Sequence, residues 1–555
     1  MLAYGALAVA LTWPLVMGLG TLVPGAPRTE LWHSMWSLDF VAQSLAEGRL
    51  PLETSQLGFP AGGTIRVNDP LGALLVAPVT LLAGVNVAMT VLVWLQLAFA
   101  GAMAHMFAAE WLNWRAGRAS SQRVGAAWVA GVSFCSTPLL LSALHNGELG
   151  TIGGGWGVWA AWMCWRAAAH GGRRHIELAV AALAVAVLGG WAGLATGLIF
   201  AAALTLLGAG EGLGVHIRAR AVVLGVGLLV VVPLSYGLQE VARDSSSLQP
   251  PVSSEEAMQL RRGIGAADPV SYLLPGSDSR AATQRERASG LRKVHMNYVG
   301  WVVLGLTILG MRRSRKGSGF LVLGGSVGAL LSLGPVLVRH GEPLIVGSQK
   351  VIPLPYFLVE ALPGFDAMTM LYRLGQAPVL ALALLAAAGV AGRRLRWLTT
   401  GLGLLVLEGR FVAPSANLPL TTRVAFSPAI QVLKSAPEGA VVNFPVVQGR
   451  AYLLEQVHHG KPMTGGLGDP ASQAADELWQ LVLEHQERDP SWVRAKISAS
   501  AKRLGIRYVM IHVDPDAQPD MHHTAIQILE RAYLPLSQPK STDPLAPSAR
   551  ILKLW

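Results

Sequence analysis

A small set of ionisable side chains stands close to the ends of long apolar runs in this 555-residue sequence. The members of the set are Glu30, Asp39, Asp69, His145, Glu148 and Arg373. A carboxylate or an imidazole can take a proton from a hydroxyl group, and a guanidinium can pair with the charge of a phosphate. Polar groups near membrane depth are costly and usually functional. If these residues lie close together in the fold, they form a site that removes a proton from a hydroxyl group next to a bound phosphate.

Two of the acids share one short stretch, RTELWHSMWSLDF (28–40). We expect this stretch to be helical, and its acids are nine residues apart, so Glu30 and Asp39 should point to nearly opposite sides. Glu30 follows Thr29 at the helix start, where an acid also stabilises a helix without doing chemistry. Asp39 is either the base itself or an acid on a solvated helix face. Glu30 is the first candidate for a catalytic base, and Asp39 is the alternative.

Each of the remaining candidates also has a structural interpretation. Asp69 precedes Pro70, an arrangement that is common in turns. His145 and Glu148 lie in ALHNGELG (143–150), which also suits a polar turn between helices. Arg373 opens an apolar run, where an arginine either reaches lipid headgroups or binds a phosphate. We predict that all four bind substrate.

The composition determines which kind of protein must position these residues. The chain is 52% hydrophobic and only 14% charged, whereas soluble domains contain about 25% charged residues. Apolar runs long enough to cross a bilayer recur down the first three quarters of the chain. The first run has no basic leader, so we expect a membrane span and not a cleaved signal peptide. The sequence excludes an ordinary soluble enzyme and predicts an α-helical polytopic membrane protein.

We expect about eleven transmembrane helices. Their predicted ranges are 2–23, 86–109, 124–142, 151–169, 176–190, 193–208, 220–237, 297–311, 319–338, 371–392 and 395–413. The apolar run 176–208 is too long for one span, and the glycines of LGGWAGL (188–194) favour a tight turn within it. Splitting this run into a helical hairpin also leaves the basic segment HIRAR on the same side as the other basic loops.

The positive charges predict the orientation. The net charge of +11 is concentrated in five short loops: NWRAGRASSQR, RAAAHGGRRH, HIRAR, RRSRK and RRLR. Short basic loops mark the cytoplasmic side of a membrane protein. No motif for nucleic-acid binding accompanies them, so we expect no nucleic-acid partner. The N-terminus is predicted to be cytoplasmic, and all six candidate residues are predicted to lie at the outer face.

The predicted outer loops differ from the basic ones. They span 24–85, 238–296 and 339–370, and the apolar part of the first is too short to span and predicts an interfacial or re-entrant helix. After Pro414 the composition becomes that of a soluble domain with alternating helix and strand patterns. We therefore divide the chain into a transmembrane domain (1–414) and a C-terminal extracytoplasmic α/β domain (415–555).

Cysteine and histidine give weaker signals. The two cysteines, Cys135 and Cys164, lie in apolar runs and predict neither a disulfide framework nor a metal site. The tail carries a histidine-rich set consisting of His458, His459, His512, Asp514, His522 and His523. Its spacing is not a known zinc pattern. We expect no cofactor, and a divalent metal in the tail is the lesser alternative.

The order of these features resembles that of bacterial GT-C superfamily glycosyltransferases, the polyprenyl-phosphate-sugar-dependent mannosyl- and arabinosyltransferases. The pieces that carry the resemblance are TWPLVMGLGTLVPG (12–25), ELWHSMWSLDFVAQSLAEGRLPL (30–52), FPAGGTIRVNDPLGALLVAPVTLLAG (59–84), SALHNGELGTI (142–152), LPGFDAMTMLYRLGQ (362–376), VVNFPV (441–446), HHGKPMTGG (458–466) and LGIRYVMIHVD (504–514). They cover most of the chain in order, although none is an invariant motif.

The resemblance implies a membrane glycosyltransferase of the bacterial inner membrane. It implies a polyprenyl-phosphate sugar donor, a glycan, lipid or protein acceptor in the cell envelope, surrounding membrane lipids, and an acid in the first outer loop that deprotonates the acceptor for inverting displacement. An aspartate usually occupies the place of Glu30 in that group, and the extra methylene here moves the carboxylate. This departure supports the alternative of a non-catalytic scaffold or a lipid- or polymer-export subunit with the same architecture.

Overall fold

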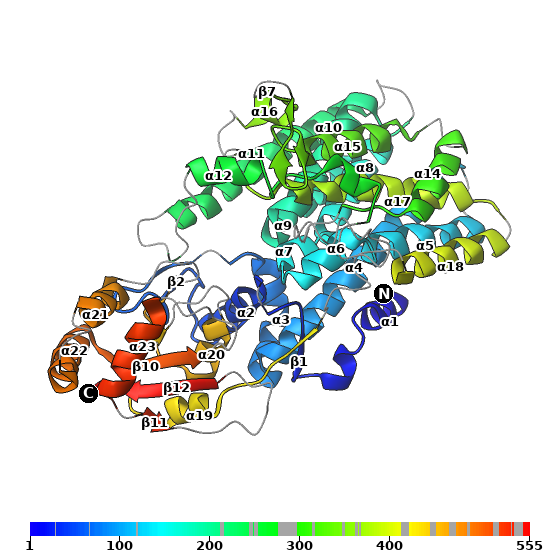
Figure 1. Cartoon of the computed structure of the whole chain (residues 1–555). Helices are drawn as coiled ribbons and strands as arrows, with labels where there is room; N and C mark the ends of the chain where they lie inside the picture. The colour runs from blue at the N-terminus through cyan, green and yellow to red at the C-terminus, as the bar shows by residue number, and fades with distance from the viewer. Residues whose placement is uncertain are drawn as a thin grey trace.

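A computed structural model provides the structure of the chain. It describes residues 1–555 except Arg28, Arg66, 118–119, 211–215, 244–247, 249–253, 276–296, 314–316, 347–349, 361–364, 366–367, Arg394, 412–420, 445–450, 466–472, 485–488, 514–520, Leu534 and 538–547. The fold is mainly helical, with a smaller mixed α/β part formed by the last quarter of the chain (Figure 1).

Three helical segments among the described residues are long and apolar enough to cross a membrane. They are α4 (Val85–Arg115), the run from α5 (Ser121–Cys135) through α6 (Pro138–His145), and the run from η3 (Leu371–Gly375) into α17 (Gln376–Val390). The tenth predicted span coincides with the last of these. The protein is membrane-embedded, and the number of eleven spans stays a prediction.

Helices occupy seven of the other predicted spans. They are α8 (Gly155–His170), α9 (Arg173–Gly189), α10 (Trp191–Leu207), α11 (Ile217–Arg243), α14 (Trp301–Arg313), α15 (Gly319–Ser332) and α18 (Leu395–Phe411). The predicted hairpin within 176–208 is present, because Gly190 separates α9 from α10 at a φ of 125° that favours glycine. Helix α15 ends six residues before the predicted end of its span, at Ser332 instead of 338.

One predicted span is wrong as a single helix. The segment 2–23 contains α1 (Leu2–Leu11), the short helix η1 (Leu15–Gly18) and strand β1 (Leu22–Pro24). Its continuity ends because Pro14 lacks a backbone N–H group and its ring clashes with the preceding helical turn. The predicted span 124–142 lies within the run Ser121–His145, which is long and apolar enough to cross a membrane and in which Pro138 starts α6 as its first residue.

The first loop (residues 24–85) contains two helices. Helix α2 (Leu31–Ala46) is buried along most of its length and packs against α3 (Pro70–Ala83), α4 and a helix of the last quarter, α20 (Ala451–His459). Helix α3 is shorter than a span, as expected, and its place in the membrane stays a prediction. The strands β2 (Glu53–Thr54) and β3 (Gly63–Thr64) pair between the two helices.

The remaining short elements lie between α11 and η3. They are α12 (Ser254–Arg261), η2 (Pro269–Tyr272), β4 (Val338–Arg339), β5 (Glu342–Pro343), β6 (Ile345–Val346), β7 (Lys350–Val351) and α16 (Tyr356–Val359). One further short helix, α7 (Leu149–Ile152), lies between α6 and α8. Strands β4 and β5 form one hairpin, and β6 and β7 form another.

Residues 421–555, which we call the C-terminal unit, form a four-stranded sheet in the order β11-β12-β10-β9. Its elements are β8 (Thr421–Arg423), α19 (Pro428–Ser435), β9 (Ala440–Phe444), α20, α21 (Gln473–Glu484), α22 (Pro490–Leu504), β10 (Ile506–Val513), α23 (Met521–Ala532), β11 (Pro535–Ser537) and β12 (Ser548–Lys553). The central pair β9–β10 is parallel, and the other pairs are antiparallel. Helices α21, α22 and α23 share one core with the sheet, and α19 shares the other.

The C-terminal unit and the first loop touch in several places (Figure 1). Strand β8 pairs with β1 in antiparallel register, Leu22 opposite Arg423. The apolar residues of α20 belong to the same core as those of α2, and not to the cores of the sheet. A domain boundary at residue 414 and an outer location of the unit stay predictions.

Candidate functional site

The start of α2 is held against the turn that follows α6. The backbone N–H of Glu30 donates to the carbonyl of Asn146 at 3.0 Å, and the hydroxyl of Ser34 donates to the carbonyl of Gly147 at 2.7 Å. Gly147 has a φ of 68°, and a Cβ there would lie 2.5 Å from the Cα of Leu31. Only glycine permits this approach. The turn therefore brings Glu30 to the segment that carries Glu148.

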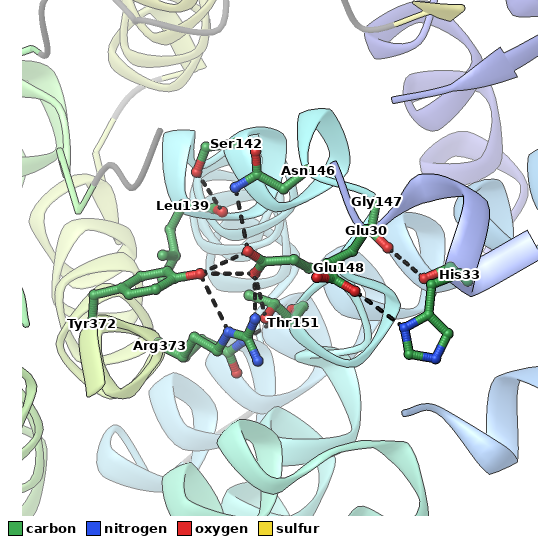
Figure 2. A network of polar contacts seen from close by, with 12 residues as sticks. Glu30, His33, Leu139, Ser142, Asn146, Gly147, Glu148, Thr151, Tyr372 and Arg373 are labelled. Atoms are coloured by element: carbon green, nitrogen blue, oxygen red, sulfur yellow. Dashed lines mark hydrogen bonds and ion pairs between the residues drawn. The ribbon is translucent and has the colours of Figure 1, made fainter. Parts of the chain in front are cut away.

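Glu148 is the centre of a polar network (Figure 2). Its carboxylate accepts hydrogen bonds from the hydroxyl of Tyr372 at 2.8 Å, the hydroxyl of Thr151 at 3.1 Å and the amide of Asn146 at 3.2 Å. The guanidinium of Arg373 contacts the same carboxylate at 3.1 Å through Nη2. Glu148 and Arg373, which belong to distant parts of the chain, are thus in direct contact.

The Arg373–Glu148 pair is largely shielded from solvent. The side chain of Glu148 is 8% exposed and that of Arg373 is 22% exposed. Arg373 also donates from Nε to the hydroxyl of Tyr372 at 3.3 Å. The guanidinium is therefore held by the Glu148 carboxylate through Nη2 and by the Tyr372 hydroxyl through Nε. A guanidinium that is held in this way can pair with the charge of an oxyanion.

Glu30 lies at the start of α2, beside this network. Its carboxylate contacts Nδ1 of His33 at 3.1 Å, and its side chain is 42% exposed whereas that of His33 is 5% exposed. Figure 2 shows the Glu30–His33 pair on one side of the Gly147 turn and Tyr372 on the other. A half-exposed carboxylate that contacts an imidazole can accept a proton and pass it on.

Asp39 lies in the middle of α2, two and a half turns from the helix start, and therefore on nearly the opposite side from Glu30. Burial raises the pKa of the Asp39 carboxyl to about 6, and a hydrogen bond from the side chain of Gln43 opposes this rise. A carboxylate with such a pKa can take a proton near neutral pH. The two predicted acids share one helix but face different neighbours.

Asp69 has the contacts of a helix cap. One carboxylate oxygen accepts from the N–H of Gly72 at 2.9 Å, and the other accepts from the amide of Gln96 at 2.5 Å, which ties α3 to α4. Burial raises the pKa of Asp69 to about 7, against the effect of these two hydrogen bonds. These contacts explain its position structurally, and its predicted role in substrate binding stays a prediction.

The other predicted residue, His145, ends α6. Its backbone carbonyl accepts from the N–H of Ala26 at 2.8 Å, which adds to the attachment of the first loop. The sequence prediction missed Thr151 and His33 as parts of the network, and it placed Tyr372 at the outer end of a span without giving it a role. Tyr372 precedes Arg373 directly, so its position beside a candidate arginine was the one signal available.

No group of three or more His, Cys, Asp and Glu side chains could hold a metal ion, as far as the described residues reach. Of the histidine-rich set, His512 contacts the side-chain oxygen of Asn443 at 3.1 Å and Glu455 at 3.7 Å. Asp514 lies outside the described residues, as do the side chains of His522 and His523. The alternative of a metal in the tail receives no support from the residues that the structure places.

Comparison with solved structures identifies the fold. The arabinofuranosyltransferase AftD from mycobacteria matches 100% of this chain with 41% of its own, at 16% identity and a TM-score of 0.51. The chain has the GT-C glycosyltransferase fold. It spans about two fifths of the length of AftD.

Two further structures match with TM-scores below 0.5. ArnT from Cupriavidus metallidurans, solved with undecaprenyl phosphate, matches 100% of this chain with 98% of its own, at 12% identity and a TM-score of 0.47. The oligosaccharyltransferase AglB from Archaeoglobus fulgidus matches 92% with 69% of its own, at 11% identity and a TM-score of 0.43. No protein-family model and no curated protein sequence matches the chain.

Proposed function

We propose that this protein transfers a sugar from a polyprenyl-phosphate donor to an acceptor outside the cytoplasm. The observation that carries the proposal is that Asn146 connects Glu30 with the Arg373–Glu148 pair: its carbonyl accepts from the backbone N–H of Glu30, and its side-chain amide donates to Glu148. A base and a phosphate-binding cation are the two groups that this reaction needs from the protein. The GT-C fold supports a membrane glycosyltransferase in general.

The proposed reaction is one direct displacement. The acceptor hydroxyl oxygen forms a bond to the anomeric carbon while the bond from that carbon to the phosphate oxygen breaks. The hydroxyl proton goes to the carboxylate of Glu30, and His33 at 3.1 Å can pass it onward. The electron pair of the broken bond stays on the polyprenyl phosphate. Arg373 stabilises the charge that develops there.

Glu148 has a supporting part in this scheme. It holds the guanidinium of Arg373 and the hydroxyl of Tyr372 in place, so that the arginine does not have to be ordered when the phosphate arrives. Asp39 is the alternative base, on the side of α2 that carries Trp36. Asp69 and His145 are proposed to shape the substrate site through α3 and the first loop.

The cellular setting of the reaction is part of the proposal. We place the site at the outer face of a bacterial inner membrane, with the N-terminus in the cytoplasm and the C-terminal unit outside. The acceptor is an envelope glycan, lipid or protein. The C-terminal unit packs against α2, so we assign acceptor selection to it.

Membranes that contain the protein test the proposal when they are supplied with a radiolabelled polyprenyl-phosphate sugar. Glu30→Gln should lower transfer about 100-fold or more, because general-base catalysis contributes on that scale. Arg373→Lys should lower it about 10- to 100-fold, since lysine lacks the planar fork. Glu47→Gln, which removes an exposed acid that pairs with Arg49 after α2, is the control and should transfer normally.

Three outcomes decide between the candidates. Loss of transfer in Glu30→Gln with normal protein levels supports Glu30 as the base. Loss in Asp39→Asn alone moves the base to Asp39. Full function of both variants in cells would contradict a glycosyltransferase and favour the non-catalytic scaffold or export subunit.

A further inference from the structure

The C-terminal unit forms hydrogen bonds with the chain segments on both sides of helix α2. Before it, β1 pairs with β8, and the hydroxyl of Thr422 donates to the carbonyl of Gly25 at 2.5 Å. After it, the N–H of Phe59 donates to the carbonyl of Met463 at 2.9 Å, and the N–H of Met463 donates to the carbonyl of Gln56 at 2.8 Å. Backbone pairing of this kind fixes both flanks of α2 to the same unit.

A single side chain makes the third contact, near the middle of the helix. The indole N–H of Trp36 donates to Oε1 of Gln456 at 2.8 Å, and the amide nitrogen of Gln456 donates to Oε1 of Gln56 at 3.0 Å. Trp36 is 2% exposed and Gln456 is 5% exposed. One buried amide on α20 therefore joins α2 and the segment that follows it.

The contact lies on the side of α2 that carries Asp39. Residues three and four positions apart share a helix face, so Trp36, Asp39 and Phe40 lie together. The rings of Trp36 and Phe40 stack at 5.0 Å, and both belong to one core with the apolar residues of α20. A displacement of Gln456 would reach this face directly.

The end of α20 is itself firmly held, so it can act as a fixed point. The N–H of Lys461 donates to Nδ1 of His459 at 3.0 Å, and the ammonium of Lys461 donates to the carbonyl of Ala436 at 2.7 Å. Burial is the main cause that lowers the pKa of His459 to about 3, which keeps this imidazole neutral as an acceptor. Gln456 thus sits on a helix whose end is fixed to the rest of the C-terminal unit.

We propose that Gln456 is a positioning residue that transmits the position of the C-terminal unit to α2 and so places the carboxylates of that helix. The inference rests on the proposed function for its effect on sugar transfer, but its structural part stands apart from catalysis. It predicts that removing the Gln456 amide loosens α2 without unfolding the C-terminal unit. When a buried indole N–H loses its acceptor, either the helix moves so that the N–H reaches water, or the N–H stays without a hydrogen bond.

The test uses Gln456→Met, which keeps the volume but removes the amide, and Trp36→Phe, which removes the donor. In the full-length protein in detergent, amide hydrogen exchange of residues 31–46 should become about tenfold faster in each variant. The effects of the two single variants on exchange should be less than additive in the double variant, because both remove the bond between Trp36 and Gln456. The exposed Trp492 of α22 provides the control Trp492→Phe, which should leave exchange in α2 unchanged.

Transfer kinetics give the functional readout. Each single variant should lower kcat about tenfold, since a small misplacement of a reacting group has effects of this order, with KM changed less than about twofold. Unchanged exchange in α2 for Gln456→Met and Trp36→Phe would overturn the inference. Faster exchange in α22 as well as in α2 would also overturn it, because that outcome means general unfolding. Absence of transfer by the unmodified protein would refute the proposed function alone, and the exchange data would still decide on Gln456.

Discussion

Burial of Asp39 makes the contribution of its carboxyl group to folding stability depend on pH. In the folded protein burial raises its pKa from 3.8 to about 6. Between these two pH values the folded chain holds a proton that the unfolded chain has released. The contribution of Asp39 to stability is therefore greatest at low pH and is lost as the pH rises through about 6.

Asp39→Asn should remove this pH dependence. The asparagine stays neutral at all pH values, so the variant should match the unmodified protein near pH 4 and exceed its stability above pH 7 by about 1–3 kcal/mol. Thermal unfolding midpoints in detergent at pH 4, 6 and 8 measure the difference. Glu47→Gln gives the baseline for removing an exposed acid, and a difference for Asp39→Asn that does not grow with pH would contradict the prediction.

The site could be predicted from sequence only in part. Glu148 and Arg373 were both singled out because charged groups are expensive near the ends of apolar runs. Their direct contact at 3.1 Å was not predictable, because no local sequence pattern reports on contacts between such distant residues. The bond from Tyr372, the neighbour of Arg373, to Glu148 likewise joins residues that are 224 positions apart. The same holds for Trp36 and Gln456, which are 420 residues apart.

At the scale of elements, the turn at Gly147 determines how α2 packs against the segment that follows α6. Gly147→Ala should destabilise the protein by about 2–4 kcal/mol, because the new Cβ would press on the backbone of Leu31 at a positive φ. The Glu30–Asn146 contact should weaken, and sugar transfer should fall with it. Thermal unfolding and transfer assays measure the two effects.

The control for this prediction is Gly48→Ala. Gly48 follows α2 with a φ of 69°, close to that of Gly147, but a Cβ there would meet nothing within 4 Å. This variant carries the backbone strain without the steric clash, so it should cost only about 1 kcal/mol. Equal losses in both variants would show that the close approach at Leu31 is unimportant.

Helical elements were predictable where the ends of apolar runs coincide with glycines that favour a turn. The split at Gly190 and the strands of the C-terminal unit follow from such local patterns. The segment 2–23 was wrong because mean apolarity does not register the effect of Pro14 on helix continuity. Helix α20 was missed, since nine residues with a pair of histidines give little periodicity from which to recognise a helix.

The orientation of the whole molecule can be tested with single cysteines. Cys135 and Cys164 are buried and would be replaced by serine first. In intact cells a membrane-impermeant thiol reagent should label Glu47→Cys, in the first loop, and should fail to label Arg174→Cys, in the basic first turn of α9, until the membrane is permeabilised. Both positions are exposed, so labelling reports sidedness and not burial. The reverse pattern would invert the proposed topology.

The pairing of β1 with β8 also determines when the site can form during biosynthesis. Gly25 receives its bond from Thr422, 397 residues later, so a ribosome needs roughly 20 to 80 seconds to supply the partner. During that time the nascent chain already contains α2 and both of its acids, but the strand and the glutamine that hold them do not yet exist. A nascent chain that ends before the C-terminal unit therefore contains the proposed base but lacks the residues that position it. The site can form only after the C-terminal unit has been synthesised.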